Sequence, residues 1–337
     1  MSNDWRPLNG VLLFDKPLEL SSNIALQKVR RLYQATKAGH TGTLDPLATG
    51  LLPICLGEAT KFSIGLLESD KTYWAQIKLG QTTTTGDAEG DVIAYKEVNI
   101  SELQVRNVLQ NLSGEILQMP PMHSAIKHKG RPLYEYIRKG ETVSREFRKV
   151  VIHDLKLTRY KADELEINVR CSKGTYIRTL AEDIGQALGC GAHLTGLRRT
   201  AIAQFSIDNA YTLLQLQAMS SQERVNCLMP LDCMLQGLPR LNLDHAQVER
   251  IAQGQRLGMD LPFPDGKIRF YSEGDFIGLG KLTGRRIAPS RLISSVAQRA
   301  AKRSNQVDDI FEVEGNLTGS LTRESTWPIP VKAIKMK

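Results

Sequence analysis

Residues 39–50 read GHTGTLDPLATG and place one acid, Asp45, in a stretch that is otherwise neutral and rich in glycine and hydroxyl groups. Glycines let a backbone turn tightly or let a ligand approach it closely. Pro46 disfavours helical dihedral angles at the residue before it, so Asp45 is pushed towards an extended geometry. The stretch therefore predicts a loop that presents a single carboxylate.

Length and composition are those of a globular protein. The chain has 337 residues, 41% hydrophobic and 24% charged, enough for one large domain and a small one. Apolar runs such as 11–14 are far too short to span a bilayer, and the first residues lack the pattern of a secretory signal. The five cysteines form no CxxC pair, which favours reduced thiols over a zinc site or a disulfide frame. We expect a cytoplasmic protein that binds no membrane.

The charge distribution points to a polyanionic partner. The formal net charge is +8, and the basic segment 127–149 carries eight basic residues against three acids, with Tyr134 and Tyr136 interleaved. Its cations are Lys127, Lys129, Arg131, Arg138, Lys139, Arg145, Arg148 and Lys149. Cations for phosphates and flat rings for bases suit a single-stranded or looped RNA. The alternative is a solvated helix and loop with ordinary aromatic packing.

Hydrophobic periodicity predicts a mixture of strands and helices without a βαβ repeat. The predicted strands are 11–16, 71–79 and 164–171, and the predicted helices are 21–34, 101–112 and 179–188. The segment 164–171 alternates cleanly, as a half-buried antiparallel strand does. The irregular order favours an α+β fold with a mixed, mainly antiparallel sheet and flanking helices.

The texture of the sequence changes near Gly237. A short helix at 244–252 and strands at 267–271 and 276–282 predict a small β-rich domain, whereas the chain after residue 297 is polar. We therefore predict a catalytic domain at 1–237 with an RNA-clasping segment at 120–150, a second domain at 238–296, and a flexible tail at 297–337.

Asp45 and Arg178 are the main candidates for chemistry. A carboxylate such as Asp45 can be a nucleophile, a general base, a metal ligand or a cap, and in a Gly/Thr/Pro turn it is often only a turn residue. Arg178 lies in GTYIRT, residues 174–179, at a strand-to-helix junction. A partly buried arginine needs an anion, and pairing with Asp45 would orient the acid and keep it ionised.

Further candidates lie on aromatic and basic segments. Tyr73 in DKTYW, residues 70–74, could stack on a base or pack in a strand. In HLTGLRRT, residues 193–200, Leu197 could wall a pocket, and Arg198 and Arg199 could contact phosphates. The alternative for that segment is a basic surface loop.

Taken together, these motifs resemble the TruB-type tRNA pseudouridine synthases. The resemblance rests on residues 39–46, 70–73, 174–178 and 193–200, and it extends to NGVLLFDKP at 9–17 and PPMHSAIK at 120–127. It covers the chain from about Asn9 to Leu231, and GLG at 278–280 and APSR at 288–291 more weakly resemble the family's PUA-type RNA-binding domain. His123 stands where the family often has tyrosine.

The resemblance implies that uridine 55 in the T loop of tRNA is isomerised to pseudouridine without a cofactor or a metal. It assigns catalysis to Asp45, an ion pair with Asp45 to Arg178, and base stacking to Tyr73, which is also a candidate base. It further implies that Tyr176 and Leu197 line the pocket of the flipped base and that His40 fills the place which the base leaves in the stack. RNA binding is assigned to Lys127, Arg198 and Arg199.

Two other functions fit parts of the sequence. An RNA-folding factor would need the basic segment but not Asp45, and a guide-RNA-dependent enzyme of related fold would need an RNA partner. The sequence predicts a protein that binds tRNA rather than DNA and acts as a monomer.

Overall fold

The computed structural model describes residues 5–124, 126–137, 139–141 and 143–296. The predicted tail at 297–337 lies outside these residues. The chain divides into two compact units, Met1–Ser221 and Gln222–Lys337. Within the described part of the chain, every helix is too short or too polar to cross a membrane.

One large mixed sheet organises the first unit. Its strands run in the order β14-β1-β3-β12-β4-β11-β10-β7, with β2 paired to β3 and β13 to β12. Their bounds are β1 Gly10–Lys16, β2 Ala38–His40, β3 Ala48–Leu56, β4 Lys71–Leu79, β7 Gly114–Gln118, β10 Arg148–Lys161, β11 Glu164–Cys171, β12 Ala192–Ile202, β13 Phe205–Ser206 and β14 Tyr211–Thr212. Only β1–β14 and β3–β12 are parallel among these pairs, so the predicted sheet type is confirmed.

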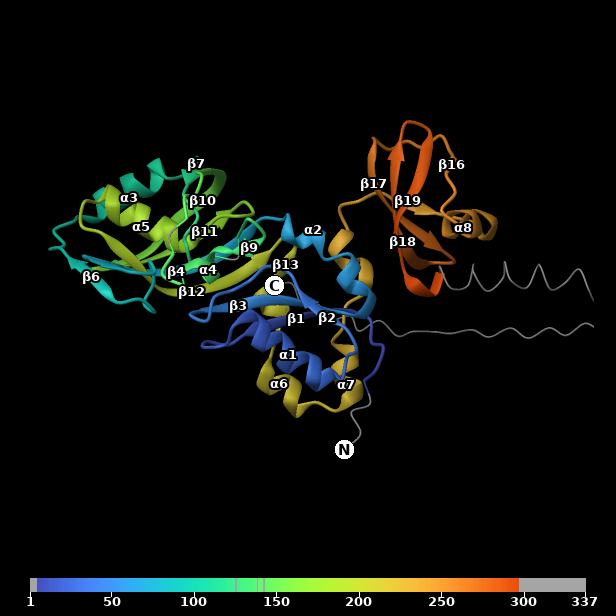
Figure 1. Cartoon of the computed structure of the whole chain (residues 1–337), viewed down its shortest axis with the longest axis horizontal. Helices are drawn as coiled ribbons and strands as arrows, with labels where there is room; N and C mark the ends of the chain where they lie inside the picture. Colours follow the sequence, from blue (N-terminus) through green and yellow to red (C-terminus); the bar gives the residue numbers. More distant parts are fainter. Residues whose placement is uncertain (1–4, 125, 138, 142, 297–337) are drawn as a thin grey trace, which may run out of the picture. The chain divides into compact units, whose positions relative to one another are not determined.

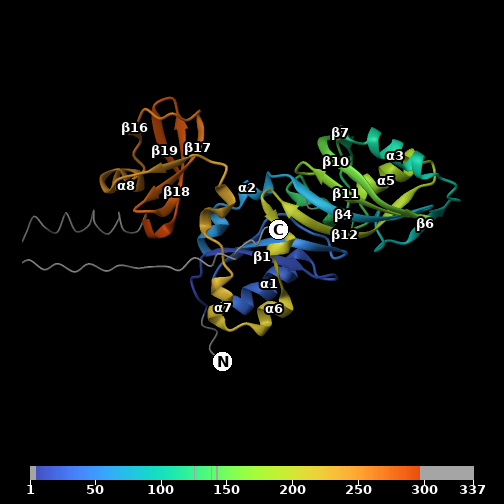
Figure 2. The ribbon, with the colours of Figure 1, turned by 180° about the vertical axis from the view of Figure 1, so that it is seen from behind.

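Helices of the first unit flank this sheet, and short elements connect it. The helices are α1 Ser22–Tyr33, α2 Ile64–Leu67, α3 Glu102–Asn111, α4 Leu133–Ile137, α5 Ile177–Ala187 and α6 Leu213–Ala218, with short 3₁₀ turns at Gly57–Lys61 and Ile207–Asn209. Helix α7, Ser221–Asn226, begins at the last residue of this unit and continues into the second. Two small hairpins pair β5 Gln81–Thr83 with β6 Val92–Tyr95, and β8 Lys127–His128 with β9 Arg131–Pro132. Helix α5 packs on β12 and β4, and α1 packs on β2 and β3 (Figures 1 and 2).

Local sequence signals account for many of these elements. Helix α1 begins where Ser21 accepts a hydrogen bond from the backbone N–H of Ile24, and α3 begins at a reciprocal capping box between Ser101 and Gln104. Strands β4 and β11 have the predicted bounds, because each alternates buried side chains with half-buried or exposed ones along its length.

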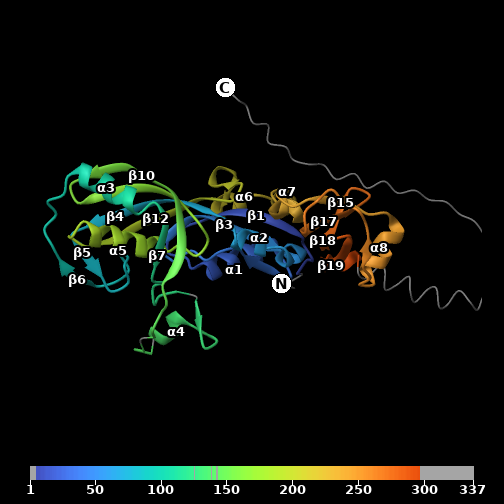
Figure 3. The ribbon, with the colours of Figure 1, turned by 90° about the horizontal axis from the view of Figure 1, so that it is seen from above.

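The basic segment occupies a projection from the sheet. Hairpin β8–β9 and helix α4 stand out from the sheet when the molecule is seen from above (Figure 3). Lys127, Lys129 and Arg131 are all exposed there, while Leu133 is buried and anchors the projection. Arg138 lies outside the described residues. These three cations are therefore open to solvent and to a ligand, whereas Arg145 is half-buried and donates to the carbonyl of Pro120.

The second unit contains a separate small sheet. Strands run in the order β15-β17-β18-β19-β16, with bounds β15 Arg240–Asn242, β16 Leu257–Gly258, β17 Gly266–Ser272, β18 Asp275–Thr283 and β19 Arg286–Leu292. Helix α8, His245–Ala252, contributes Ile251 to a core that also holds Phe270 and Ile287, and a 3₁₀ turn spans Leu231–Leu235. The predicted β-rich C-terminal fold is confirmed.

Two sequence-based expectations need correction. The loop expected over residues 39–50 is shorter than predicted. Residues 39–40 belong to β2 and residues 48–50 to β3, so only residues 41–47 lie outside the sheet. The segment 193–200 is not a surface loop but lies within β12, a central strand between β3 and β4. A glycine and two arginines make this strand look like a loop, and only its neighbours reveal that it is interior.

Candidate active site

The loop that carries Asp45 is held by hydrogen bonds from a neighbouring helix. Ser22, the buried first residue of α1, accepts a hydrogen bond from the N–H of Leu44 at 2.7 Å and donates one to its carbonyl at 2.8 Å. The N–H of Glu19 donates to the carbonyl of Pro46, and Ala48 closes a turn onto the carbonyl of Asp45. The carboxylate of Asp45 is thus presented from a backbone that is tied down on both sides.

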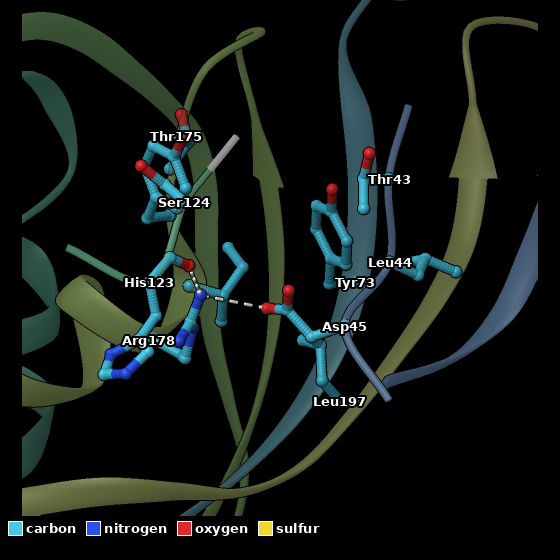
Figure 4. Close-up of a pocket in the computed structure, with 11 residues that line it drawn as sticks. Thr43, Leu44, Asp45, Tyr73, His123, Ser124, Thr175, Arg178 and Leu197 are labelled. Carbon is cyan, nitrogen blue, oxygen red and sulfur yellow. Dashed lines mark hydrogen bonds and ion pairs between the residues drawn. The ribbon is translucent and has the colours of Figure 1, made fainter. Parts of the chain in front are cut away.

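Arg178 lies in the first turn of α5 and faces this carboxylate. Its Nη2 is 3.1 Å from Oδ2 of Asp45 and donates to the carbonyl of His123 at 2.7 Å (Figure 4). Its side chain is 7% exposed, whereas that of Asp45 is 41% exposed. The structure therefore contains the ion pair expected from the sequence, and Asp45 is the more exposed of its two side chains.

Arg178 has a second carboxylate partner, Asp87, which the sequence analysis did not identify. Oδ2 of Asp87 is 3.3 Å from Nη1 of Arg178, and the Asp87 side chain is 2% exposed. Oδ1 of Asp87 accepts hydrogen bonds from the hydroxyl of Thr85 and the N–H of Glu89. Residues 82–91 read TTTTGDAEGD, so the same signal that marked Asp45, an acid in a Gly/Thr turn, could have found it.

The surroundings of Asp45 raise the pKa of its carboxyl group. Burial raises the pKa of Asp45, the Arg178 guanidinium opposes this rise, and the nearby Asp87 carboxylate adds to it. Arg178 thus offsets part, but not all, of the free-energy cost of keeping Asp45 ionised in this cavity.

A cavity of about 430 Å³ opens beside Asp45 (Figure 4). Its lining is Thr43, Leu44, Asp45, Tyr73, His123, Ser124, Thr175, Tyr176, Ile177, Arg178 and Leu197. The volume lies in the usual range for small-ligand sites and accommodates a nucleobase with its sugar. Apolar and aromatic walls with one carboxylate suit a flat, weakly polar ring.

The cavity walls come from strands and a helix start that are distant in sequence. Tyr73 on β4 is 9% exposed, and burial raises the pKa of its hydroxyl. Leu197 lies opposite Ala75 on the neighbouring strand, next to Tyr73. The backbone of Tyr176, just before α5, is held by the amide of Gln118 through two hydrogen bonds. The structure thus brings Tyr73, Tyr176 and Leu197 together around Asp45.

Other predicted site residues lie outside this lining. His40 is on β2 opposite Ile54, half-buried, and burial lowers the pKa of its ring. Lys127 is exposed on β8. Arg198 is paired through two hydrogen bonds with the carboxylate of Asp15, at 2.7 and 3.1 Å, so its charge is already engaged.

The prediction of a surface phosphate contact by Arg199 was wrong. Its residue surface is only 1% exposed, and its Nε donates to the carbonyl of Leu51 at 2.7 Å. Alternation along β12 turns Arg199 into the interior and Arg198 to the other face of the sheet. Two adjacent arginines that look alike in sequence therefore have different environments.

The described residues contain no group of three His, Cys, Asp or Glu side chains placed to hold a metal ion.

Family models match almost all of the described chain. The TruB family pseudouridylate synthase N-terminal domain matches residues 30–177, the tRNA pseudouridylate synthase B C-terminal domain matches 178–236, and the pseudouridine synthase II TruB C-terminal domain matches 239–293. The chain belongs to the TruB family of pseudouridine synthases, which confirms the family resemblance seen in its sequence.

Individual relatives agree with this assignment. The chain is 52% identical to the tRNA pseudouridine synthase B of Methylobacillus flagellatus over 295 residues, covering 87% of this chain and 98% of the relative. It is also 52% identical to the protein of that name from Aromatoleum aromaticum over 293 residues, covering 87% and 95%.

Solved structures share the fold at lower identity. A Cbf5–Nop10–Gar1 complex matches with a TM-score of 0.66 and 24% identity over 87% of each chain. An archaeal box H/ACA sRNP Nop10–Cbf5 complex matches with a TM-score of 0.64 and 23% identity, covering 85% of this chain and 86% of the other. At this identity the likeness supports the fold alone.

Proposed function

We propose that this protein isomerises uridine to pseudouridine in tRNA, at position 55 of the T loop. The observation that carries the proposal is the open Asp45 carboxylate, held by a buried arginine at the wall of a base-sized cavity. The 52% identical relatives named tRNA pseudouridine synthase B support the tRNA substrate.

The reaction needs one bond broken and one bond made within the same nucleotide. The N1–C1′ bond breaks, the uracil turns in the cavity, and C5 bonds to C1′. The hydrogen on C5 leaves as a proton and N1 gains one, so product and substrate have the same atoms and no electrons are transferred. Uracil leaves as a stabilised anion and stays in the cavity, so one carboxylate suffices where glycosidases use two.

Asp45 acts on the ribose in this proposal. Its ionised carboxylate either attacks C1′ as a nucleophile or assists a glycal-forming path, and both routes need the charged form. Arg178 orients the carboxylate and opposes the rise in its pKa. Tyr73 stacks on the flipped uracil, and Tyr176 and Leu197 close the other walls. Asp45 and Tyr73 are both candidates to accept the C5 proton.

RNA reaches the cavity only after a base leaves its stack. Enzymes that act on a base inside folded nucleic acid flip it into a pocket. In this proposal Lys127 and its exposed neighbours clasp the RNA stem-loop, and His40 fills the vacated stack. The C-terminal β-rich unit adds PUA-like RNA contacts, and the protein works in the cytoplasm as a monomer.

Replacing Asp45 with Asn tests the proposal. We expect Asp45→Asn to lower the rate of tritium release from T-arm RNA labelled at C5 of uridine by at least about 10³-fold, because it removes a group that acts on the reacting atom. RNA binding, measured by filter retention, should stay within about threefold of the original protein, because the clasping cations are unchanged.

Asp70→Asn is the matched control, since the Asp70 side chain is also 41% exposed but pairs with His153 and Arg170 instead of Arg178. Full tritium release by Asp45→Asn would overturn the catalytic role. Unmodified RNA after incubation with the purified protein alone would favour an RNA-folding or guide-dependent activity.

A further inference from the structure

Arg199 occupies the centre of the sheet below the proposed catalytic groups. On β12 it pairs with Gly50 of β3 on one side and with Tyr73 of β4 on the other. It is 1% exposed and heads the set of large, fully buried side chains. Burying a guanidinium is costly unless its N–H groups are hydrogen-bonded, so its partners show what the residue does.

The hydrogen-bond partners of Arg199 lie in the Asp45 loop and on the neighbouring strand β3. Nη2 donates to the carbonyl of Gly42 at 3.1 Å, in the loop that carries Asp45, and Nε donates to the carbonyl of Leu51 at 2.7 Å. Arg199 also lies directly opposite Tyr73 in the register of β12 and β4, so the two buried side chains are cross-strand neighbours. One rigid, planar group therefore joins the Asp45 loop to the stacking tyrosine.

Two glycines of the 39–50 stretch leave room for this arginine. A Cβ on Gly50 would lie 2.4 Å from the carbonyl oxygen of Arg199, and a Cβ on Gly42 would lie 3.3 Å from its Nη1. Both glycines also have positive φ angles, +102° and +82°, which side chains disfavour. Gly42 thus leaves room for the Arg199 side chain, and Gly50 allows β3 to lie close to the backbone of residue 199.

We infer that Arg199 is a positioning residue: it lies beside the Tyr73 ring, binds the Gly42 carbonyl in the Asp45 loop, and so sets how Tyr73 faces Asp45. This inference rests on the proposed function and deepens it, because it concerns the same cavity. The Arg199 side chain is a buried cross-strand neighbour of Tyr73 and so limits the positions that the Tyr73 ring can take. Its charge also opposes the rise in the pKa of Tyr73 that burial causes.

The test compares Arg199→Lys and Arg199→Met with the original protein. Tyrosine labelled with ¹³C at Cζ reports the ionisation of each ring, and Tyr73→Phe identifies the Tyr73 signal by its loss. We expect the Tyr73 signal to move in both variants and the pKa of its hydroxyl to rise in Arg199→Met, where the opposing charge is gone.

Kinetics give a second readout. We expect kcat on T-arm RNA to fall about 10- to 100-fold, as for a slightly misplaced reacting group, while KM stays within about threefold. Arg199→Lys keeps the charge and serves if Arg199→Met does not fold. Arg269→Lys, which alters another buried arginine in the second unit, is the control and should change neither the Tyr73 signal nor kcat.

An Arg199→Lys protein with an unchanged Tyr73 signal and an unchanged kcat would overturn the inference. So would a raised KM at unchanged kcat, which would mean a contact with RNA. If the original protein forms no pseudouridine, the proposed function fails, but the Tyr73 signal still decides whether Arg199 positions that ring.

Discussion

Two buried arginines in this protein each hold an aspartate, and they differ in what the aspartate is free to do. In the first unit Arg178 is 7% exposed and its partner Asp45 is 41% exposed. In the second unit the Arg269 side chain is 10% exposed and its partner Asp232 is 15% exposed. One pair keeps its acid open to a cavity, while the other encloses it.

The enclosed pair, Arg269 and Asp232, belongs to a network of side-chain hydrogen bonds. Arg269 Nη1 contacts Asp232, Gln236 and the hydroxyl of Tyr271, and that hydroxyl also donates to Asp232. Burial and Asp232 raise the pKa of Tyr271 to about 12, so the hydroxyl remains a donor. Arg240 stacks on the Tyr271 ring with its Cζ 3.9 Å from the ring centre. Such a network ties the 3₁₀ turn at Leu231–Leu235 to the small sheet, and its acid is less exposed than Asp45.

The open pair has its own enclosed member, Asp87, which suggests a division of labour. Asp87 pairs with Arg178 from within and is 2% exposed, whereas Asp45 is 41% exposed and, in the proposed function, meets the ligand. A buried ion pair is weak evidence for stability, whereas breaking one leaves an uncompensated charge. The difference teaches that exposure of the acid, and not the presence of an ion pair, separates a reactive aspartate from a structural one.

The largest effect should come from Asp87→Asn. Removing this charge frees Arg178 to draw closer to Asp45, so we expect kcat on T-arm RNA to fall about 10- to 100-fold through misplacement. The free energy of unfolding should drop by about 1–3 kcal/mol, measured by urea denaturation, because buried hydrogen bonds lose their charged acceptor. Asp163→Asn, which alters an exposed partner of Lys78, is the control. A fully active Asp87→Asn protein would break the proposed division of labour.

The pH dependence of kcat/KM should show an effect of intermediate size. Because the pKa of Asp45 is raised, activity should decline, as pH falls, at a higher pH than an ordinary aspartate would give. Asp87→Asn removes a neighbouring negative charge, so this acid limb should move to lower pH. A limb that stays in place, or moves upward, would show that Asp87 does not act on Asp45.

The same shift makes a linked prediction for stability. The folded protein keeps the Asp45 proton to a higher pH than the unfolded chain does, so the free energy of unfolding should fall as pH rises through that interval. The side chain introduced by Asp45→Asn does not titrate, so this variant should lose this part of the pH dependence of the free energy of unfolding.

The smallest effect on catalysis should come from Asp232→Asn. The second unit should lose about 1–3 kcal/mol of stability, because Arg269 and Tyr271 are left with a weaker partner. Limited proteolysis of the β17–β19 region reports this loss, and kcat at saturating T-arm RNA should not change. A large fall in kcat would mean that the enclosed pair is also functional.

Local pattern was sufficient for part of the fold. Strands β4 and β11 and the cap of α1 follow from alternation and from Ser21, which act over a few residues. Strand β12 was missed because its arginines and glycine are atypical of a buried strand. Their environment is set by β3 and β4, which lie far away in the sequence.

The candidate site divides in the same way. Asp45, Arg178, Tyr73, Tyr176 and Leu197 were all anticipated from motifs, and they meet at one cavity. The buried roles of Ser22, Asp87 and Arg199 were not anticipated, since a serine in a helix, an acid in a turn and an arginine beside another arginine have many ordinary explanations.

By itself, the sequence determined the family of the protein and pointed to Asp45 as the candidate catalytic residue, because a lone acid in a glycine-rich loop and its companion motifs are properties of short segments. Only the tertiary structure decided which charges are open and which are enclosed. Burial and pairing depend on segments that the sheet brings together, as when Arg178 meets both Asp45 and Asp87 and Arg199 meets both Gly42 and Tyr73. The cost of an unpaired buried charge exists only after folding, so no single segment can encode it.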